Sequence, residues 1–152
     1  MTKMFMIFGR ICYWVGWPIF KVILGKSKRS RGVVVCEDKI LVVKSWLGNG
    51  KWNLPGGGIK SGENAKLAFI RELSEETGII VNQSMVGKIG DFEYDNDGLV
   101  FRYSLFRVIC DKPTKILRQK NEIYQANWIN IRNLSAKNSN SDVCIALSKV
   151  DI

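Results

Sequence analysis

The sequence predicts an α/β fold in which helices cover both faces of a mixed β-sheet. Five runs of residues are rich in β-branched and aromatic side chains, which is typical of strands. A helical pattern separates the second run from the third, and a shorter one follows the fifth. Strands and helices in this order indicate a layered α/β/α sandwich. Because the chain has 152 residues and 46% of them are apolar, we expect one domain with a substantial core.

The expected elements can be placed along the chain. The strands are expected at Gly32–Cys36, Ile40–Trp46, Val86–Tyr94, Leu99–Cys110 and Ile123–Ile131. A turn is predicted at Gly48-Asn49-Gly50, and a hairpin turn at Asp95-Asn96-Asp97-Gly98. Ser141–Val150 is expected to form a short closing helix.

The longest helix is expected to follow a glycine-rich turn, Leu54-Pro55-Gly56-Gly57-Gly58. Three consecutive glycines permit a close approach of the backbone to another group. Ser61-Gly62-Glu63-Asn64 supplies residues that favour a helix start, and Gly78 supplies a stop. The helix should therefore begin after these residues and run to about Thr77.

A helical wheel divides this helix into an apolar face and an acidic face. The apolar face, expected to pack on the core, carries Leu67, Ile70 and Leu73. The acidic face carries three glutamates and two small residues that leave room for a ligand: Glu72, Glu75, Glu76, Ala65 and Ala68.

Three carboxylates on one face repel one another, and Arg71 can pair with Glu75 one turn away. A hard cation such as Mg²⁺ would relieve the repulsion, because it prefers oxygen ligands and shares its coordination with phosphates and water. The alternative is a solvated acidic face that binds nothing. The neighbouring glycine turn favours the metal and phosphate site.

The spacing of this segment resembles the Nudix box. In that pattern a glycine is followed after five residues by a glutamate, and after seven more by Arg-Glu-apolar-any-Glu-Glu-any-Gly-apolar. The matching residues are Gly57, Glu63, Arg71, Glu72, Leu73, Glu75, Glu76, Gly78 and Ile79. The preceding Trp52-Asn53-Leu54-Pro55 also looks like the family's lead-in, and the flanking strands extend the resemblance from about Arg31 to the C-terminus.

The resemblance implies the family's α/β/α sandwich and a role for each residue of the box. Glu72, Glu75 and Glu76 would be metal ligands, and the Gly57 carbonyl would reach the metal. Arg71 would mainly orient Glu75, while Glu63 would be structural or a more distant ligand. The implied cofactor is Mg²⁺, with Mn²⁺ as a substitute.

The implied activity is hydrolysis of the pyrophosphate bond in a nucleoside diphosphate linked to another group, or in a related nucleotide pyrophosphate. Metal-activated water would attack phosphorus. The general base varies in this family, and Glu122 is the candidate outside the box, with an ordinary exposed loop glutamate as the alternative. The second functional class is a Nudix-fold binding or regulatory module that does not cleave its nucleotide. Retention of all three acids disfavours it.

Substrate selection is less well defined by the sequence. Four residues are candidates for stacking on a base or sugar or for contacting phosphate: Lys44, Trp52, Tyr94 and Arg102. For each, ordinary packing or a solvated charge is the alternative. A small-molecule nucleotide is the expected partner, and no nucleic acid is expected, because residues 32–152 carry 16 basic and 14 acidic side chains.

The remaining positive charge lies in an N-terminal arm. Residues 1–31 carry seven basic and no acidic side chains, and we divide the chain into an arm at 1–30 and a catalytic domain at 31–152. The arm is expected to form an amphipathic helix whose basic residues and tryptophans suit a membrane interface. Packing on the domain or in a homodimer, and a transmembrane span, are the alternatives. The four cysteines show no paired spacing, so a cytoplasmic location is expected, at the inner membrane surface if the arm binds lipid.

Overall fold

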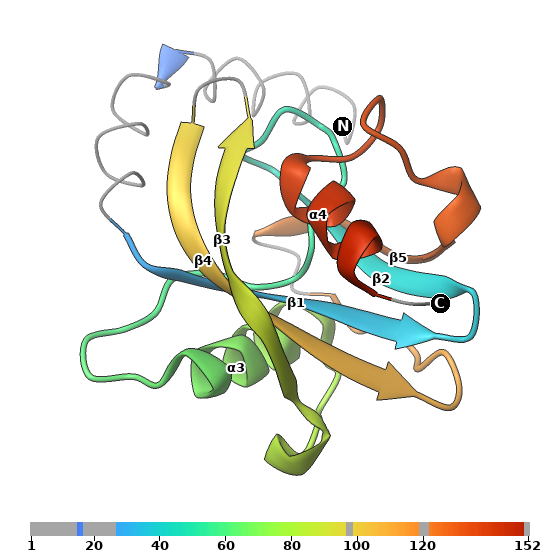
Figure 1. Cartoon of the computed structure of the whole chain (residues 1–152). Helices are drawn as coiled ribbons and strands as arrows, with labels where there is room; N and C mark the ends of the chain where they lie inside the picture. The colour runs from blue at the N-terminus through green and yellow to red at the C-terminus, as the bar shows by residue number, and fades with distance from the viewer. Residues whose placement is uncertain (1–14, 17–26, 97–98, 119–121, 151–152) are drawn as a thin grey trace.

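The computed structural model describes residues 15–16, 27–96, 99–118 and 122–150. In this part of the chain five strands form one mixed sheet with the order β3-β4-β1-β2-β5 (Figure 1). The strands are β1 at Arg29–Cys36, β2 at Lys39–Ser45, β3 at Gly87–Asn96, β4 at Leu99–Cys110 and β5 at Ile123–Asn130. The five predicted strands are therefore present, and β1 begins three residues before its predicted start.

Strand β1 lies in the centre of the sheet. It pairs in parallel with β4, from Arg29 opposite Tyr103 to Cys36 opposite Cys110, and antiparallel with β2. Strand β2 pairs antiparallel with β5, and β3 pairs antiparallel with β4 across the predicted hairpin. One parallel pair among antiparallel ones makes the sheet mixed, as predicted.

Two helices cover opposite faces of the sheet (Figure 1). Helix α3, Ala65–Thr77, packs on one face with Val34 of β1, and helix α4, Ser141–Lys149, shares the other apolar cluster with Val33 and Val35. Neighbouring residues of β1 enter opposite layers because side chains alternate along a strand. The predicted α/β/α sandwich is confirmed. Two short 3₁₀ turns, η1 at Gln83–Met85 and η2 at Ile131–Asn133, lie in the connections.

The ends of α3 follow from local chemistry. The Asn64 side chain accepts a hydrogen bond from the Lys66 backbone N–H at 2.9 Å. At the other end Gly78 has φ of 73° and donates its N–H to the Ser74 carbonyl at 2.9 Å. An asparagine cap and a left-handed glycine are common devices for starting and ending a helix.

The predicted core face of α3 is confirmed in part, because Leu73 is fully buried and Ile70 packs against the same apolar cluster. Leu67 is 46% exposed, whereas Ala68 and Phe69 are fully buried. The Phe69 ring stacks on Phe106 with centroids 5.9 Å apart, and it occupies the space beside Gly32, where an added Cβ would come within 2.1 Å of the ring. In this orientation Ala68 is fully buried and Ala65 is half-buried against the apolar cluster, rather than open to a ligand.

The N-terminal helix predicted within residues 1–30 lies outside the described residues, apart from residues 15–16 and 27–30. In the described part of the chain, none of the helices is long and apolar enough to cross a membrane. Cys36, Cys110 and Cys144 are free thiols.

Candidate functional site

The glycine-rich loop before α3 is fastened along strand β1. Ser30 donates its backbone N–H to the Gly57 carbonyl at 2.9 Å, and Gly32 donates to the Pro55 carbonyl at 3.1 Å. Gly56 has φ of 135°, and an added Cβ there would lie 2.2 Å from the Ser30 carbonyl oxygen. Glycine at 56 therefore permits both the backbone conformation and the close contact with β1.

The same loop contacts the two inner glutamates of α3. The Gly56 N–H donates to Glu76 Oε2 at 2.9 Å. A Cβ added at Gly57 would come within 2.6 Å of both carboxylate oxygens of Glu72. The loop thus places its backbone directly against the carboxylates of Glu72 and Glu76.

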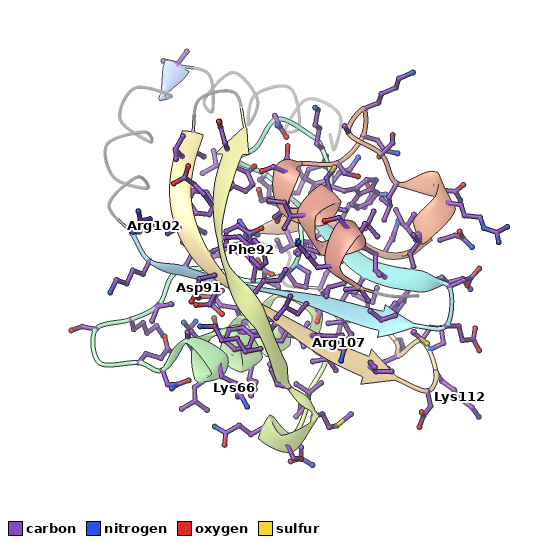
Figure 2. All side chains as sticks on the ribbon, in the orientation of Figure 1. Lys66, Asp91, Phe92, Arg102, Arg107 and Lys112 are labelled. Carbon is purple, nitrogen blue, oxygen red and sulfur yellow. The ribbon has the colours of Figure 1, made fainter. Side chains whose placement is uncertain are left out.

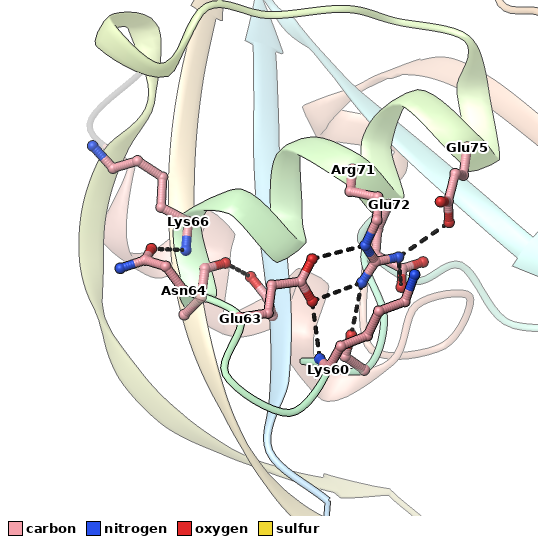
Figure 3. Close-up of polar contacts among 10 residues, drawn as sticks. Lys60, Glu63, Asn64, Lys66, Arg71, Glu72 and Glu75 are labelled. Carbon is pink, nitrogen blue, oxygen red and sulfur yellow. Dashed lines mark hydrogen bonds and ion pairs between the residues drawn. The ribbon is translucent and has the colours of Figure 1, made fainter.

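Arg71 is the centre of the outer part of the site (Figure 3). Its Nε and Nη2 donate to the two carboxylate oxygens of Glu63 at 2.8 and 3.0 Å. Its Nη1 donates to Glu72 at 2.7 Å and to Glu75 at 3.1 Å, and Nη2 also donates to the Gly58 carbonyl at 3.1 Å. The expected pairing with Glu75 is present, but Arg71 binds two further carboxylates, so it joins the loop to the helix.

Glu63 belongs to this outer network. Besides its two bonds from Arg71, it accepts the Lys60 backbone N–H at 2.9 Å. Hydrogen bonds from Arg71 and Lys60 lower the pKa of the Glu63 carboxyl to about 2. These contacts stabilise the turn that leads into α3.

Glu76 is in a different environment from the other two glutamates. It is only 7% exposed, and its side chain lines a cavity of about 200 Å³. Burial raises the pKa of the Glu76 carboxyl to about 8, although the positive charge of Arg31 and the hydrogen bond from Gly56 act in the opposite direction. A buried carboxylate with little compensation is a favourable partner for a cation.

The donor set fits a hard divalent cation by its chemistry, since Glu72, Glu75 and Glu76 offer carboxylate oxygens from one helix. In the described residues, however, no three acidic side chains already converge as a metal cluster. Arg71 bonds Glu72 and Glu75, whereas Glu76 accepts from the Gly56 N–H and lines the cavity. A metal would have to share these oxygens with Arg71.

The four predicted substrate residues are distributed unevenly. Tyr94 lines the cavity and stacks on Phe101 with centroids 4.5 Å apart. Trp52 is buried, and Lys44 Nζ lies 4.2 Å from the centroid of its ring. Arg102 is exposed on β4 and does not line the cavity (Figure 2). Tyr94 is thus the one of the four that the structure places in the cavity with Glu76.

Glu122, the predicted accessory acid, is exposed and also lines the cavity. Its backbone carbonyl accepts the Trp46 N–H at 3.0 Å, which attaches the start of β5 to the end of β2. The structure therefore brings Glu122 to the same cavity as Glu76 from a distant part of the sequence.

Six polar residues that line this cavity were not predicted as site residues from the sequence: Arg29, Arg31, Ser45, Asn49, Asn53 and Asn140. The two arginines continue the basic run of the arm, yet both lie in β1. Their spacing of two residues was the available signal, because it places both side chains on one face of a strand.

Comparison with known proteins agrees with the motif. Residues 26–145 match the family model for the NUDIX domain. The chain is 30% identical over 103 residues to the uncharacterized Nudix hydrolase YvcI of Bacillus subtilis, a match that covers 67% of this chain and 65% of that protein. The matches to the first three curated relatives cover only 36–65% of the length of those proteins.

Two solved structures show the same fold. A MutT NUDIX hydrolase from Burkholderia pseudomallei superposes with a TM-score of 0.71 at 19% identity, over 82% of this chain and 98% of that one. A bifunctional NMN adenylyltransferase/ADP ribose pyrophosphatase from Francisella tularensis, complexed with AMP and a manganese ion, superposes with a TM-score of 0.68 at 22% identity, over 86% and 44%. The family model, the curated relatives and these folds agree, and the chain belongs to the NUDIX domain family.

Proposed function

We propose that this protein is a Mg²⁺-dependent hydrolase that cleaves the pyrophosphate bond of a nucleoside diphosphate linked to another group, or of a related nucleotide pyrophosphate. The observation that carries the proposal is the position of Glu76. It is a buried carboxylate that lines a cavity beside a glycine loop, on a helix with two further glutamates. Curated relatives of this chain are named Nudix hydrolases, which supports the hydrolase class.

The proposed metal ligands are Glu72, Glu75 and Glu76, with the Gly57 carbonyl as a further oxygen donor. Bound Mg²⁺ would neutralise phosphate charge and acidify a coordinated water. Mn²⁺ is the proposed substitute, and the manganese ion in the Francisella tularensis neighbour supports it. Arg71 would hold Glu72 and Glu75 in place, because its guanidinium contacts both.

The other proposed roles follow from the cavity. Glu76 would bind the metal at the buried end of the cavity. Glu122, which lines the same cavity, would accept a proton from the attacking water. Tyr94 would contact the organic part of the substrate, because its ring is stacked on Phe101 at the cavity wall. Trp52, Lys44 and Arg102 stay predictions without a place in the cavity.

The proposed partner is a small-molecule nucleotide, and the AMP bound to the Francisella tularensis neighbour supports that class. Membrane contact through residues 1–30, a homodimer and a location at the inner membrane surface stay predictions. Most of the arm on which they depend lies outside the described residues.

The test is phosphate release with Mg²⁺ across a panel of nucleoside diphosphate derivatives, coupled to a phosphatase. We expect metal-dependent turnover that falls by roughly 10²-fold or more in Glu76→Gln, in a variant that circular dichroism shows to be folded. Full activity in Glu76→Gln would reject Glu76 as a metal ligand. Tight nucleotide binding without turnover on any compound would instead favour the non-catalytic binding module.

A further inference from the structure

Two groups can be compared among the polar side chains that line the cavity beside Glu76. Three are amides, Asn49, Asn53 and Asn140, and two are guanidinium groups, Arg29 and Arg31. The amides and the guanidinium groups differ in how many of their hydrogen-bonding groups already have a partner within the protein. That difference indicates which groups have bonding capacity left for a ligand.

The amides are bonded to one another. Asn49 Nδ2 donates to Asn140 Oδ1 at 2.8 Å, and Asn140 Nδ2 donates to Asn53 Oδ1 at 2.8 Å. Asn53 Nδ2 donates to the Lys51 carbonyl at 3.3 Å. This chain of bonds holds the loop after β2 against the start of α4, so the amides are already occupied by structural contacts.

Arg29 is satisfied much less. Its guanidinium lies over the Phe101 ring, 5.2 Å from the centroid, and its buried Nε has no hydrogen-bond partner. In the described part of the chain no carboxylate lies within ion-pair distance of it. Burial and the charge of Arg31 lower the pKa of Arg29 to about 10, so the side chain keeps its charge at neutral pH.

Arg31 is held on one side only. Its Nη1 donates to the Leu54 carbonyl at 2.7 Å and lies 3.9 Å from the buried Asp142 carboxylate. Its Nε is buried without a partner, as in Arg29. Two positive charges two residues apart on one strand face repel each other, and leaving a buried donor unpaired costs roughly 1–3 kcal/mol.

We propose that Arg29 and Arg31 bind a phosphate group of the substrate in the cavity that Glu76 lines. A guanidinium presents N–H donors in a planar fork that matches phosphate oxygens, and an anion in the cavity that both arginines line would offset their neighbouring positive charges. The inference rests on the proposed function and extends it, because it assigns phosphate binding to the central strand instead of to the exposed Arg102. A cation–π contact with the Phe101 ring, 5.2 Å from its centroid, holds the Arg29 guanidinium at the cavity wall.

The experiment measures binding of inorganic pyrophosphate without metal, by isothermal titration calorimetry in EDTA at low salt. Arg29→Gln removes the charge at a residue whose buried Nε has no hydrogen bond to lose, and we expect roughly tenfold weaker binding or more. Arg31→Lys keeps a charge near Asp142 but loses the planar fork, and we expect severalfold weaker binding. Arg107→Gln, at an exposed arginine of β4 outside the cavity, is the charge-matched control and should bind within twofold of the unchanged protein.

Equal affinity in all four proteins, or no binding by the unchanged protein, would overturn the inference. If circular dichroism shows that Arg29→Gln does not fold, Arg29→Lys replaces it with the same expected direction. The outcome is separable from that of the hydrolase test. Turnover that depends on Glu76, with pyrophosphate binding unaffected by the arginines, rejects only this inference. Arginine-dependent binding without turnover on any compound rejects only the proposed hydrolysis.

Discussion

The carboxylate of Glu72 lies against the α-carbon of Gly57, so closely that a methyl group at 57 would overlap both carboxylate oxygens at about 2.6 Å. We therefore expect Gly57→Ala to displace Glu72 and to lower metal-dependent turnover by roughly tenfold or more, with a loss of about 1–3 kcal/mol in unfolding free energy from the forced shift. Turnover and urea unfolding check both effects.

Gly58→Ala is the matched control, because an added Cβ at Gly58 meets nothing within 4 Å. It should leave turnover and unfolding free energy close to those of the unchanged protein. If the two variants behave alike, the close packing of Gly57 on Glu72 is not what the site requires.

Arg71→Ala should destabilise the protein by about 2–3 kcal/mol, because it leaves Glu63 and Glu72 close together without their shared cation. Both carboxylates are less than one fifth exposed, so solvent compensates only in part. Arg71→Lys should be intermediate, since an ammonium cannot reproduce the fork that bonds both oxygens of Glu63. Urea unfolding ranks the three proteins by their free energy of unfolding. Equal stability of all three would show that the bonds from Arg71 to Glu63 and Glu72 do not stabilise the fold.

The raised pKa of Glu76 predicts that the free energy of unfolding falls as pH rises, whereas a carboxylate in an ordinary ion pair stabilises the protein more as pH rises. The folded protein keeps its proton up to about pH 8, whereas the unfolded chain loses it near 4.5. The folded state binds more protons between these values, so in EDTA the unfolding free energy should fall as pH rises through this window. Each pKa unit corresponds to about 1.4 kcal/mol, which makes the fall a few kcal/mol.

Glu76→Gln isolates this contribution, because glutamine keeps an oxygen that can accept the Gly56 N–H but does not titrate. The difference in unfolding free energy between the unchanged protein and the variant should vary across pH 4.5–8 and level off on either side. A difference that is constant with pH would show that the Glu76 pKa is not raised.

Gly32→Ala should destabilise the core, since its Cβ would come within 2.1 Å of the Phe69 ring. We expect a loss of about 1–3 kcal/mol in unfolding free energy, which a second change, Phe69→Leu, should partly restore by removing the ring. Gly87→Ala in β3, where an added Cβ meets nothing, should cost much less. No rescue by Phe69→Leu would indicate that Gly32 is required for another reason.

Much of the fold could be predicted because its signals are local. The bounds of β4 and the αL glycine at 78 follow from side-chain alternation and from turn chemistry within a few residues. The burial of Phe69 in place of Leu67 on α3 could not be predicted in this way. It depends on the fit of Phe69 beside Gly32, two residues that are 37 positions apart and that only the folded sheet brings together.

The same distinction holds for the candidate site. The motif predicted the residues of the loop and helix, and the structure adds that Arg71 also bonds Glu63 and Glu72. Arg29 and Arg31 were missed because their charges continue the basic run that begins at Lys26. Only the parallel pairing of β1 with β4 places them beside Phe101 and Tyr94.

The attachment of the glycine loop to both β1 and α3 has a consequence for how this region opens. Gly57 accepts from β1, Gly56 donates to α3, and Ile59 donates to the Lys28 carbonyl at 3.1 Å, so the loop cannot swing away without breaking bonds on two elements. Its amides should exchange with solvent deuterium about as slowly as those of the central strand, in one cooperative unit with the start of α3. The glycine loop then stays in place when a ligand enters the cavity, and any opening involves the other segments that line it.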